Sequence, residues 1–317
     1  MKVLYVTNMY PTASYTYNGI HVKEQIDYLT TNYPIDKEIY FIDGGRSKVN
    51  YFKSMFTANR LIKKNNYDLV HVHFGLSGLF LLVNPFIKTP VVLTIHGSDI
   101  NSSKNLGLMK LVTKMVIPLV NRVIILNDKM ITKLAAHRKK LVKIPCGINI
   151  GQFELERNNH GKQFVIGFPG NKSREVKNYP LFEKIVDGVA ARGVQVETVE
   201  FHNLTREEVA LNLSRLDCLL MTSHSEGSPQ IIKEAMASGI PIVSANVGDV
   251  ELVISDVDNC TVIDSYNPDD YVEAIMKLTT ITPEKRITNG KQKLSLLGLD
   301  QPSVCSKVYE LYKSLVN

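Results

Sequence analysis

The sequence lacks the features that mark membrane-spanning, exported or disulfide-bonded proteins. Its longest apolar stretch, residues 78–87, contains Asn84 and Pro85 and is too short to span a bilayer. Residues 1–8 have no signal-peptide core with a small-residue cleavage site, so we expect them to form a buried strand. The four cysteines form no Cys-x-x-Cys pair and no metal-ligand spacing, which indicates reduced thiols in a cytoplasmic protein.

Three further absences limit the ligands that we expect the protein to bind. The long loop at residues 8–22 has no G-x-G-x-x-G pattern, so the dinucleotide fingerprint is missing. No Asp-x-Asp pair stands on a loop that resembles a metal site. No nucleic-acid recognition motif is present either. We therefore predict no metal, no cofactor and no nucleic-acid partner.

The charge is unevenly distributed along the chain. The net charge is +6, but residues 1–150 carry 20 Lys and Arg against 8 Asp and Glu, whereas the remainder carries 17 against 23. This asymmetry supports a domain boundary near residue 150. The basic half suits an anionic partner, which leaves phosphates, an acidic glycan and an anionic membrane surface open.

Short apolar runs alternate with amphipathic segments of helix length in both halves, which predicts an α/β fold with two parallel sheets. We expect one domain over residues 1–155 and a second over 156–302, joined by the polar stretch 151–163. Residues 303–316 have the pattern of an amphipathic helix that could pack on either domain, with 303–317 returning to the first as one option. Ligands of such sheets bind at the carboxyl ends of the strands. The expected strands are 3–6, 38–42, 69–73, 91–95, 122–126, 142–144, 164–168, 195–199, 218–221, 241–245 and 261–263. The expected helices are 21–30, 106–120, 179–192, 205–214, 229–238 and 268–278.

The most informative motif lies at residues 225–243, where a buried strand is followed by a loop and a helix. Ser228 is predicted as the helix N-cap and Pro229 as its first residue. Backbone N–H groups at the helix start suit a diphosphate. Glu226 in the loop and Glu234 on the helix could each bind a pair of vicinal hydroxyls, although two carboxylates alone could also be solvated surface acids.

The surrounding residues decide between these alternatives. The stretch fits E-G-x-P-x-x-x-x-E-A-M-A-x-G-x-P, with Glu226, Gly227, Pro229, Glu234 and the residues that follow. It resembles the donor-site signature of the retaining glycosyltransferases of family 4. The resemblance implies the GT-B fold, in which two Rossmann-like domains face each other across a cleft. It also implies metal-independent transfer from a nucleotide-sugar, with a UDP-sugar favoured, to a glycan or lipid-linked acceptor in polysaccharide or glycolipid synthesis.

The same resemblance assigns roles to matching positions. Glu226 would hold the donor sugar near its anomeric carbon, and Glu234 would bind the ribose. The backbone of Gly227, Ser228 and Pro229 would lie along sugar and phosphate.

A basic loop at residues 169–178 follows another buried strand. Fixed cations there would stabilise the charge of a departing diphosphate. Lys177-Asn178 stands where the family has Lys-Gly, and either Lys172 or Arg174 takes the place of the usual Arg. Lys177 is our preferred candidate, and a solvated basic loop is the alternative.

Histidines mark the first half. His96 follows a strand in a segment similar to the family's T-x-H-G-x-D, which implies contact with the transferred sugar. Gly19 occupies the place of a glycine that lies beside the donor phosphates in the family. His71 and His73 alternate along one strand; a metal pair is one interpretation, but with no third ligand evident we favour packed histidines.

A basic segment at residues 106–117, with Lys110 and Lys114 four apart, could be an amphipathic helix that docks on anionic lipid or a core helix with one solvated edge. We expect a cytoplasmic protein that docks peripherally at the inner membrane surface. Two other functions remain open at this point: another GT-B enzyme such as a nucleotide-sugar epimerase, and an inactive nucleotide-sugar-binding module.

Overall fold

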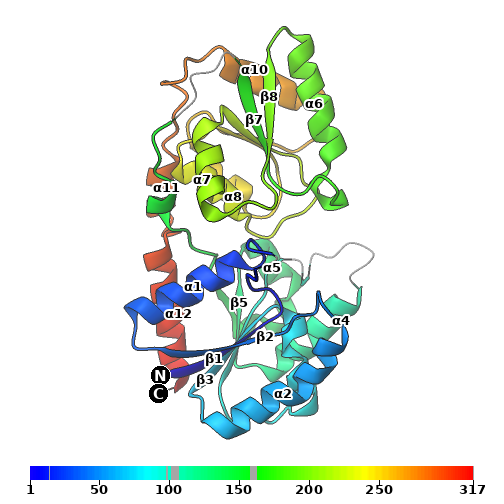
Figure 1. The fold of residues 1–317 in the computed structure, drawn as a ribbon, viewed down its shortest axis with the longest axis vertical. Coiled ribbons are helices and arrows are strands. Elements are labelled where there is room, and N and C mark those ends of the chain that lie inside the picture. The colour runs from blue at the N-terminus through cyan, green and yellow to red at the C-terminus, as the bar shows by residue number, and fades with distance from the viewer. Residues whose placement is uncertain (14, 98, 101–106, 158–162, 317) are drawn as a thin grey trace. The chain divides into compact units, whose positions relative to one another are not determined.

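The computed structural model describes residues 1–13, 15–97, 99–100, 107–157 and 163–316. The chain divides into two α/β units, which Figure 1 draws as separate sheets with their helices. Unit 1 comprises Met1–Gly147 and Gln301–Asn317, and unit 2 comprises Ile148–Asp300. The chain thus passes from unit 1 to unit 2 at residues 147–148, whereas we expected the boundary at residues 155–156, inside the predicted linker.

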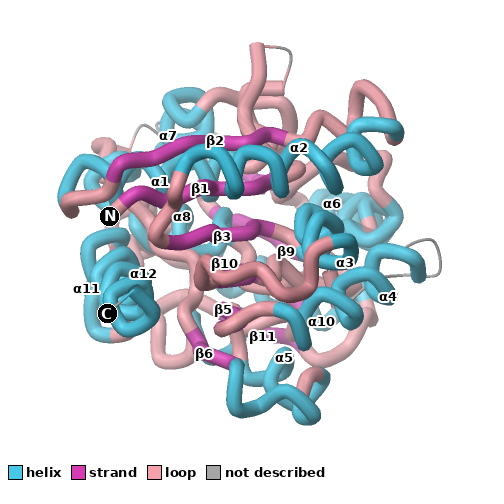
Figure 2. The backbone as a smooth tube through the Cα atoms, turned by 90° about the horizontal axis from the view of Figure 1, so that it is seen from below, coloured by secondary structure: helices cyan, strands magenta, loops and turns pink. Residues whose placement is uncertain are grey.

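Unit 1 is built on a six-stranded sheet in the order β2-β1-β3-β4-β5-β6, and every neighbouring pair is parallel. Figure 2 shows β2, β1 and β3 following one another in this order. The predicted strands agree with the observed ones to within about two residues. The strands are β1 Lys2–Thr7, β2 Asp36–Phe41, β3 Leu69–His73, β4 Val91–Thr94, β5 Arg122–Ile125 and β6 Leu141–Lys143.

Alternate side chains of the strands supply two separate cores in unit 1. In β1, Val3 and Tyr5 face one core, whereas Leu4 and Val6 face the other, as the two-residue period of a strand requires. The helices α1 and α12 cover the first face, and α2, α3 and α4 cover the second. The helices are α1 Ile20–Asn32, α2 Val49–Asn65, α3 Phe80–Val83, α4 Gly107–Val116, α5 Asp128–Lys133 and α12 Gln301–Val316, with 3-10 turns at Gly75–Leu79, Ile117–Leu119 and Ala135–Lys140.

The C-terminal helix α12 belongs to unit 1, which answers the question that its sequence left open. Figure 1 draws it beside α1. Gln301 donates from Nε2 to the carbonyl oxygen of Glu24 in α1, 2.8 Å away, and the rings of Tyr33 and Tyr309 stack with centroids 4.3 Å apart. The last helix therefore completes the core of the first unit.

One predicted helix proved shorter than expected. The sequence pattern suggested a helix from residue 106 to 120, but α4 ends at Val116 and a 3-10 turn, Ile117–Leu119, follows. Pro118 has no N–H to donate to the preceding turn, so the α-helical ladder cannot continue through it. Residue 106 lies outside the described residues.

Unit 2 has a five-stranded parallel sheet in the order β11-β10-β9-β7-β8. Its elements are β7 Phe164–Phe168, α6 Tyr179–Ala191, β8 Val196–Glu200, α7 Arg206–Arg215, β9 Cys218–Met221, α8 Gln230–Ala237, β10 Ile242–Ala245, α9 Val250–Ile254, β11 Thr261–Ile263, α10 Pro268–Thr279 and α11 Gly290–Leu296, with 3-10 turns at Ile150–Phe153 and Glu175–Lys177. Phe153 is buried in the core of this unit. The predicted linker 151–163 therefore begins as part of unit 2.

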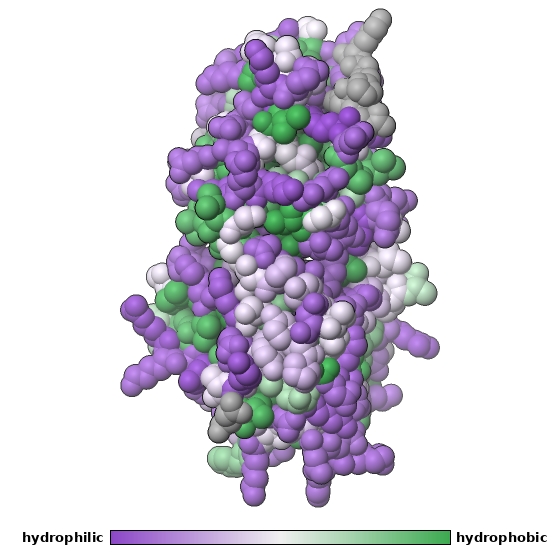
Figure 3. All heavy atoms as spheres, turned by 90° about the vertical axis from the view of Figure 1, so that its left-hand side faces the viewer, coloured by the Kyte–Doolittle hydropathy of each residue, from purple (hydrophilic) through white to green (hydrophobic). Residues whose placement is uncertain are grey.

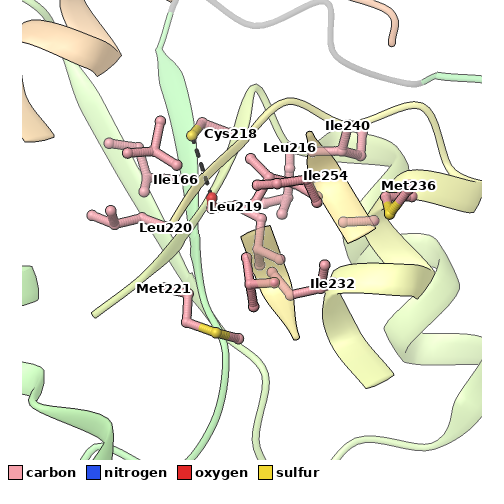
Figure 4. Packing of buried hydrophobic residues seen from close by; sticks show 14 of the residues in the cluster. Ile166, Leu216, Cys218, Leu219, Leu220, Met221, Ile232, Met236, Ile240 and Ile254 are labelled. Atoms are coloured by element: carbon pink, nitrogen blue, oxygen red, sulfur yellow. Dashed lines mark hydrogen bonds between the residues drawn. The ribbon is translucent and has the colours of Figure 1, made fainter. Parts of the chain in front are cut away.

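The core of unit 2 contains buried side chains of both β9 and α8. Leu219 of β9 and Ile232 and Met236 of α8 belong to one fully buried cluster (Figure 4). Cys218 is buried in the same cluster, and its Sγ lies 3.5 Å from the carbonyl oxygen of Leu219. This packing fixes α8 against the sheet, and with it the loop between β9 and α8.

None of the described helices combines the length and the apolar character that crossing a bilayer requires. The face drawn in Figure 3 carries mostly hydrophilic side chains, with small groups of hydrophobic ones among them.

Candidate functional site

Three loops of unit 2 come together because their strands are neighbours. The strands β10, β9 and β7 lie side by side and parallel, so the loops after them leave the same edge of the sheet. The loop after β7 carries Lys177, the loop after β9 carries Glu226, and the loop after β10 carries Gly248. The sheet order thus gathers residues that are up to 71 positions apart in the sequence.

Lys177 and Glu226 form an ion pair at this edge. Lys177 Nζ donates to Glu226 Oε1 across 2.8 Å. The side chains are only 12% and 17% exposed, so the pair is largely shielded from solvent. The structure therefore brings together the two residues of this unit for which we predicted a catalytic role.

The backbone beside Lys177 accounts for the departure from the family's Lys-Gly pattern. Asn178 has a φ of 51° and a ψ of 51°, which is the left-handed conformation. Among residues with a side chain, asparagine adopts this conformation comparatively readily. Asn178 therefore replaces glycine here with little backbone strain, and the chain then enters α6.

Gly170 lies against the aliphatic part of Lys177. A Cβ at this position would be 2.8 Å from Cε of Lys177, and the φ of 139° is unfavourable for any other residue. The backbone conformation therefore favours glycine, and the absence of a side chain leaves room for the aliphatic part of Lys177.

Gly248 supports the loop that carries Glu226. Its φ is 59°, and a Cβ at this position would be 2.4 Å from the carbonyl oxygen of Gly227. The two backbone segments are therefore in direct contact, and the Glu226–Gly227 peptide rests on the loop after β10.

The start of α8 differs from the sequence prediction. The N-cap is Pro229, with an extended ψ of 120°, and the helix begins at Gln230 rather than at Pro229. Ser228 does not cap the helix, and its Oγ accepts a hydrogen bond from Lys233 Nζ, 2.7 Å away. Lys233 is only 1% exposed, and the sequence analysis missed it. A lysine between apolar positions of a short helix was the signal that could have found it.

Glu234 is paired with a residue that the sequence analysis also missed. Arg206, at the start of α7, donates from NH1 to Glu234 Oε1 across 2.7 Å. The Glu234 side chain is 6% exposed, so it is not the solvated surface acid of the alternative interpretation. The guanidinium of Arg206 also lies 4.8 Å from the ring centroid of Phe153. Glu234 is thus fixed in a buried, charge-paired position.

Lys172 and Arg174 lie on the exposed part of the loop after β7. The ammonium of Lys172 lies over the ring of Tyr179, 6.0 Å from its centroid. Within the described part of the chain, Arg174 forms no ion pair. Arg174 is therefore the less engaged of the two candidates for the family's arginine.

Unit 1 gathers its histidines at the carboxyl ends of β3 and β4. His73 Nδ1 and His96 Nε2 share a hydrogen bond of 3.2 Å. His71 contacts Tyr312 of α12 through Nδ1 and Thr94 through Nε2, the latter at 2.7 Å. The C-terminal helix thus contributes directly to the histidine cluster.

Burial keeps these imidazoles neutral near pH 7. It lowers the pKa of His71 to about 3 and the pKa values of His73 and His96 well below the ordinary value, and neighbouring imidazoles add to the effect. A neutral His96 can donate or accept hydrogen bonds but does not repel a cation or attract an anion by charge.

Asp99 holds the turn after β4. It accepts hydrogen bonds from the backbone N–H of His96, 2.7 Å away, and of Gly75, 3.0 Å away. Burial raises its pKa to about 6, and the backbone hydrogen bonds limit this rise. Asp99 therefore fixes the backbone from which the His96 side chain projects.

Gly19 stands at the N-terminus of α1 with a φ of 68°. A Cβ here would be 2.3 Å from the carbonyl oxygen of Met9, so the loop after β1 is in contact with the helix start. His21, in the first turn of α1, has its ring centroid 4.8 Å from that of His96. The structure thus places Gly19 near the histidine cluster of unit 1.

Within the described ranges, no group of three His, Cys, Asp or Glu residues is arranged to hold a metal ion. The His71 and His73 side chains are engaged instead with the tyrosine, threonine and histidine partners described above.

Two family models match the chain, one in each half. The model described as Glycosyltransferase Family 4 matches residues 15–152, and the model described as Glycosyl transferases group 1 matches residues 156–293. The first range contains Gly19 and His96, and the second contains Lys177, Glu226 and Glu234.

Individual relatives agree with these matches. The chain is 20% identical over 315 residues to UDP-Gal:alpha-D-GlcNAc-diphosphoundecaprenol alpha-1,3-galactosyltransferase of Escherichia coli, which covers 85% of this chain and 81% of the relative. The structure of sucrose-phosphate synthase from Thermosynechococcus elongatus matches with a TM-score of 0.79 at 14% identity, over 99% of this chain and 98% of that one. Anabaena Alr3699/HepE, in complex with UDP-glucose, matches with a TM-score of 0.68 at 15% identity, over 99% and 100% of the two chains.

Proposed function

Because the chain belongs to the group 1 glycosyltransferases and has their GT-B fold, we propose that it moves a sugar from a nucleotide-sugar to a glycan or lipid-linked acceptor with retention of anomeric configuration and without a metal ion. The proposal rests above all on the shielded pair of Lys177 and Glu226 beside the start of α8. A cation and a carboxylate at adjoining positions suit a ligand that carries both phosphates and sugar hydroxyls. We favour a UDP-sugar, since HepE was solved with UDP-glucose.

The described side chains suit the successive parts of such a donor. Glu234, held by Arg206, is assigned to the ribose hydroxyls. Backbone N–H groups at the start of α8 and the ammonium of Lys177 are assigned to the diphosphate, with Arg174 or Lys172 as a further cation. Glu226 is assigned to the sugar hydroxyls, and in unit 1 Gly19 to the phosphates and His96 to the transferred sugar, as the family resemblance implies.

The proposed chemistry is a displacement on one face of the sugar. The bond between C1 and the phosphate oxygen breaks, and the acceptor hydroxyl oxygen bonds to C1 from the same side. The acceptor proton passes to the departing phosphate. Lys177 and the N-terminus of α8 stabilise the negative charge that develops on the leaving diphosphate.

We further propose that unit 1 docks peripherally on an anionic membrane surface, at the cytoplasmic side of the inner membrane. The outer face of α4 carries Leu108, Leu111 and Met115, whose side chains are 73%, 55% and 49% exposed, beside exposed Lys110 and Lys114. An exposed apolar stripe flanked by lysines is typical of helices that lie in a lipid interface.

A second exposed stripe supports this docking surface. Phe52 and Phe56 on α2 are 64% and 59% exposed, and Phe86 after α3 is 90% exposed. Figure 2 draws α3 between α2 and α4. Exposed aromatic residues of this number need an explanation, and insertion among lipid headgroups provides one. A lipid-linked acceptor, such as the substrate that the name of the Escherichia coli relative describes, would be reached from that surface.

Three measurements test the enzymatic part of the proposal. A thermal-shift panel of UDP-, GDP- and ADP-sugars should show one base stabilising the protein more than the others. The preferred donor, incubated with undecaprenyl-diphosphate-linked sugar and EDTA, should yield a product whose new linkage has the donor's anomeric configuration by NMR. An inverted linkage would refute retention, and loss of the rate in EDTA would refute metal independence. An isomerised donor formed without acceptor would favour the epimerase.

Vesicle co-sedimentation tests the membrane contact. Wild-type protein should sediment with vesicles that contain phosphatidylglycerol and less so at high salt, because salt screens the lysines. Replacing Leu108, Leu111 and Met115 by serine should abolish sedimentation. Leu296→Ser is the matched control, because Leu296 is 84% exposed but lies in unit 2. Equal loss in the control, or no binding of the wild type, would refute the docking surface.

A further inference from the structure

Lys233 is a buried cation for which the proposed chemistry has no role. It lies on α8, its exposed fraction is 1%, and its Nζ donates to Ser228 Oγ across 2.7 Å. Removing an ammonium group from water costs several kcal/mol, and apolar residues of similar volume usually serve a core equally well or better. Since stability alone does not account for the lysine, a functional role must be considered.

The hydrogen bond determines the direction of the serine proton. An ammonium group can only donate, so Ser228 Oγ must be the acceptor in this contact. The hydroxyl proton of Ser228 consequently points away from Lys233. Across the described part of the chain, Ser228 donates to no acceptor. The serine therefore offers a donor that the protein itself does not use.

The location of this donor indicates its ligand. Ser228 is 8% exposed, follows Glu226 by two residues and directly precedes the N-cap of α8. The first backbone N–H groups of α8 lie at this end of the helix, and the first turn contains no acidic residue. An unused O–H donor, a helix N-terminus and a buried positive charge behind them all favour an anion with several oxygens.

We propose that Lys233 is a positioning residue for the diphosphate of the donor, acting through Ser228. Its ammonium fixes the serine hydroxyl so that the O–H donates to a phosphate oxygen, and its charge strengthens that hydrogen bond by polarising the hydroxyl. The inference rests on the proposed function, because it concerns the same donor site. It adds Lys233 as a residue that affects the binding of the phosphates and not of the sugar or the base.

Isothermal titration with inorganic pyrophosphate and with UDP tests this arrangement. Lys233→Met removes the charge at similar volume, and Ser228→Ala removes the hydroxyl. Each should weaken pyrophosphate binding about tenfold, in line with the loss of one charge-assisted hydrogen bond. The double variant should be no weaker than either single variant, because the lysine acts through the serine. Ser228→Thr keeps the hydroxyl and should bind within about twofold of wild type.

A structural role for Lys233 predicts a different result. If the lysine only supported the fold, Lys233→Met would lower the thermal unfolding midpoint by several degrees. Pyrophosphate affinity would then fall only because the protein is less stable. We expect the midpoint to remain within about 3 °C of wild type, since methionine fills the same space. The control is Lys184→Met, which replaces an exposed lysine of α6 and should change neither quantity.

The outcomes separate this inference from the proposed function. Wild-type pyrophosphate affinity in Lys233→Met would refute the action of Lys233 through Ser228. So would a double variant whose affinity falls about a hundredfold, the product of the two single losses. Neither result would affect the proposed sugar transfer. A wild-type protein that binds neither pyrophosphate nor UDP and transfers no sugar would refute the donor site itself.

Discussion

Replacing Gly248 by alanine should displace the catalytic loop without touching any catalytic side chain. The new Cβ would be 2.4 Å from the carbonyl oxygen of Gly227, whereas an ordinary carbon–oxygen contact is about 3.3 Å. The backbone segments must therefore separate by close to 1 Å. The neighbour is backbone, so no side-chain rotation can relieve the contact.

The size of the effect follows from this displacement. A shift of about 1 Å at a catalytic group costs on the order of a hundredfold in rate, so kcat should fall about a hundredfold. Overpacking costs about 1–3 kcal/mol, and alanine in the left-handed conformation costs about 1 kcal/mol more. Initial rates with the nucleotide-sugar that most stabilises the wild type, together with urea unfolding, measure both quantities.

Gly193→Ala separates steric displacement from backbone strain. Gly193 has a φ of 87°, but a Cβ there would have no neighbour within 4 Å. This variant should lose about 1 kcal/mol of unfolding free energy and keep its turnover. Wild-type turnover in Gly248→Ala, or an equal loss of turnover in Gly193→Ala, would refute the reasoning.

Three further variants probe the charged and buried groups. Lys177→Ala and Glu226→Ala should each lower kcat at least a hundredfold while the donor KM changes less, and wild-type rates in both would remove the assignment. Arg206→Met should lower the unfolding free energy by about 3 kcal/mol, because it leaves Glu234 buried without its partner; the added change Glu234→Gln should restore at least half of this in urea unfolding. Acidification from pH 7.5 to 5.5 should lower the free energy of unfolding, and His73→Gln should reduce this decrease by about half.

The sign of the pH effect follows from the histidine pKa values. Burial lowers the pKa values of His71, His73 and His96 in the folded protein, so below about pH 6.5 the unfolded chain binds protons that the folded one does not. Their stabilising contribution is present above pH 6.5 and lost below it, at about 1.4 kcal/mol each by pH 5.5. Asp99 acts in the opposite direction, since its raised pKa favours the folded state as it protonates, by about 1 kcal/mol. Unchanged urea midpoints would contradict the neutral buried histidines.

The sequence predicted the elements well because the alternation of apolar residues reports directly on burial. The strands of both sheets and most helices agree to within about two residues. The positions of Lys177 and Glu226 at strand ends were also predictable. Their contact was not predictable from physics alone, because it depends on β9 and β7 being neighbours in the sheet.

The errors occurred where specific side-chain contacts override the preferences that residue types show on average. Ser228 has the composition of an N-cap, but its hydroxyl is bonded to Lys233 and not to a backbone N–H. Phe153 lies in a polar stretch that resembles a linker, yet it is buried beneath Arg206. The partner of Glu234 could not be identified from sequence, since Arg206 lies 28 residues earlier on a different helix. Phe153 and Glu234 have their partner Arg206 far away in the sequence, whereas Ser228 and Lys233 are only five residues apart.

The pairing of Lys177 with Glu226 bears on ligand selection. A free diphosphate that engages Lys177 draws the lysine away from the shielded carboxylate of Glu226, and a free sugar that engages Glu226 weakens the same ion pair. A sugar diphosphate supplies an anion to the lysine and hydroxyl donors to the carboxylate, so both groups gain hydrogen-bond partners when the pair separates. The intact donor should therefore bind more tightly than its nucleoside diphosphate. The difference in affinity should exceed what the additional sugar contacts explain. Glu226→Gln should narrow that difference, because the neutral amide loses less than the carboxylate does when a free diphosphate draws Lys177 away.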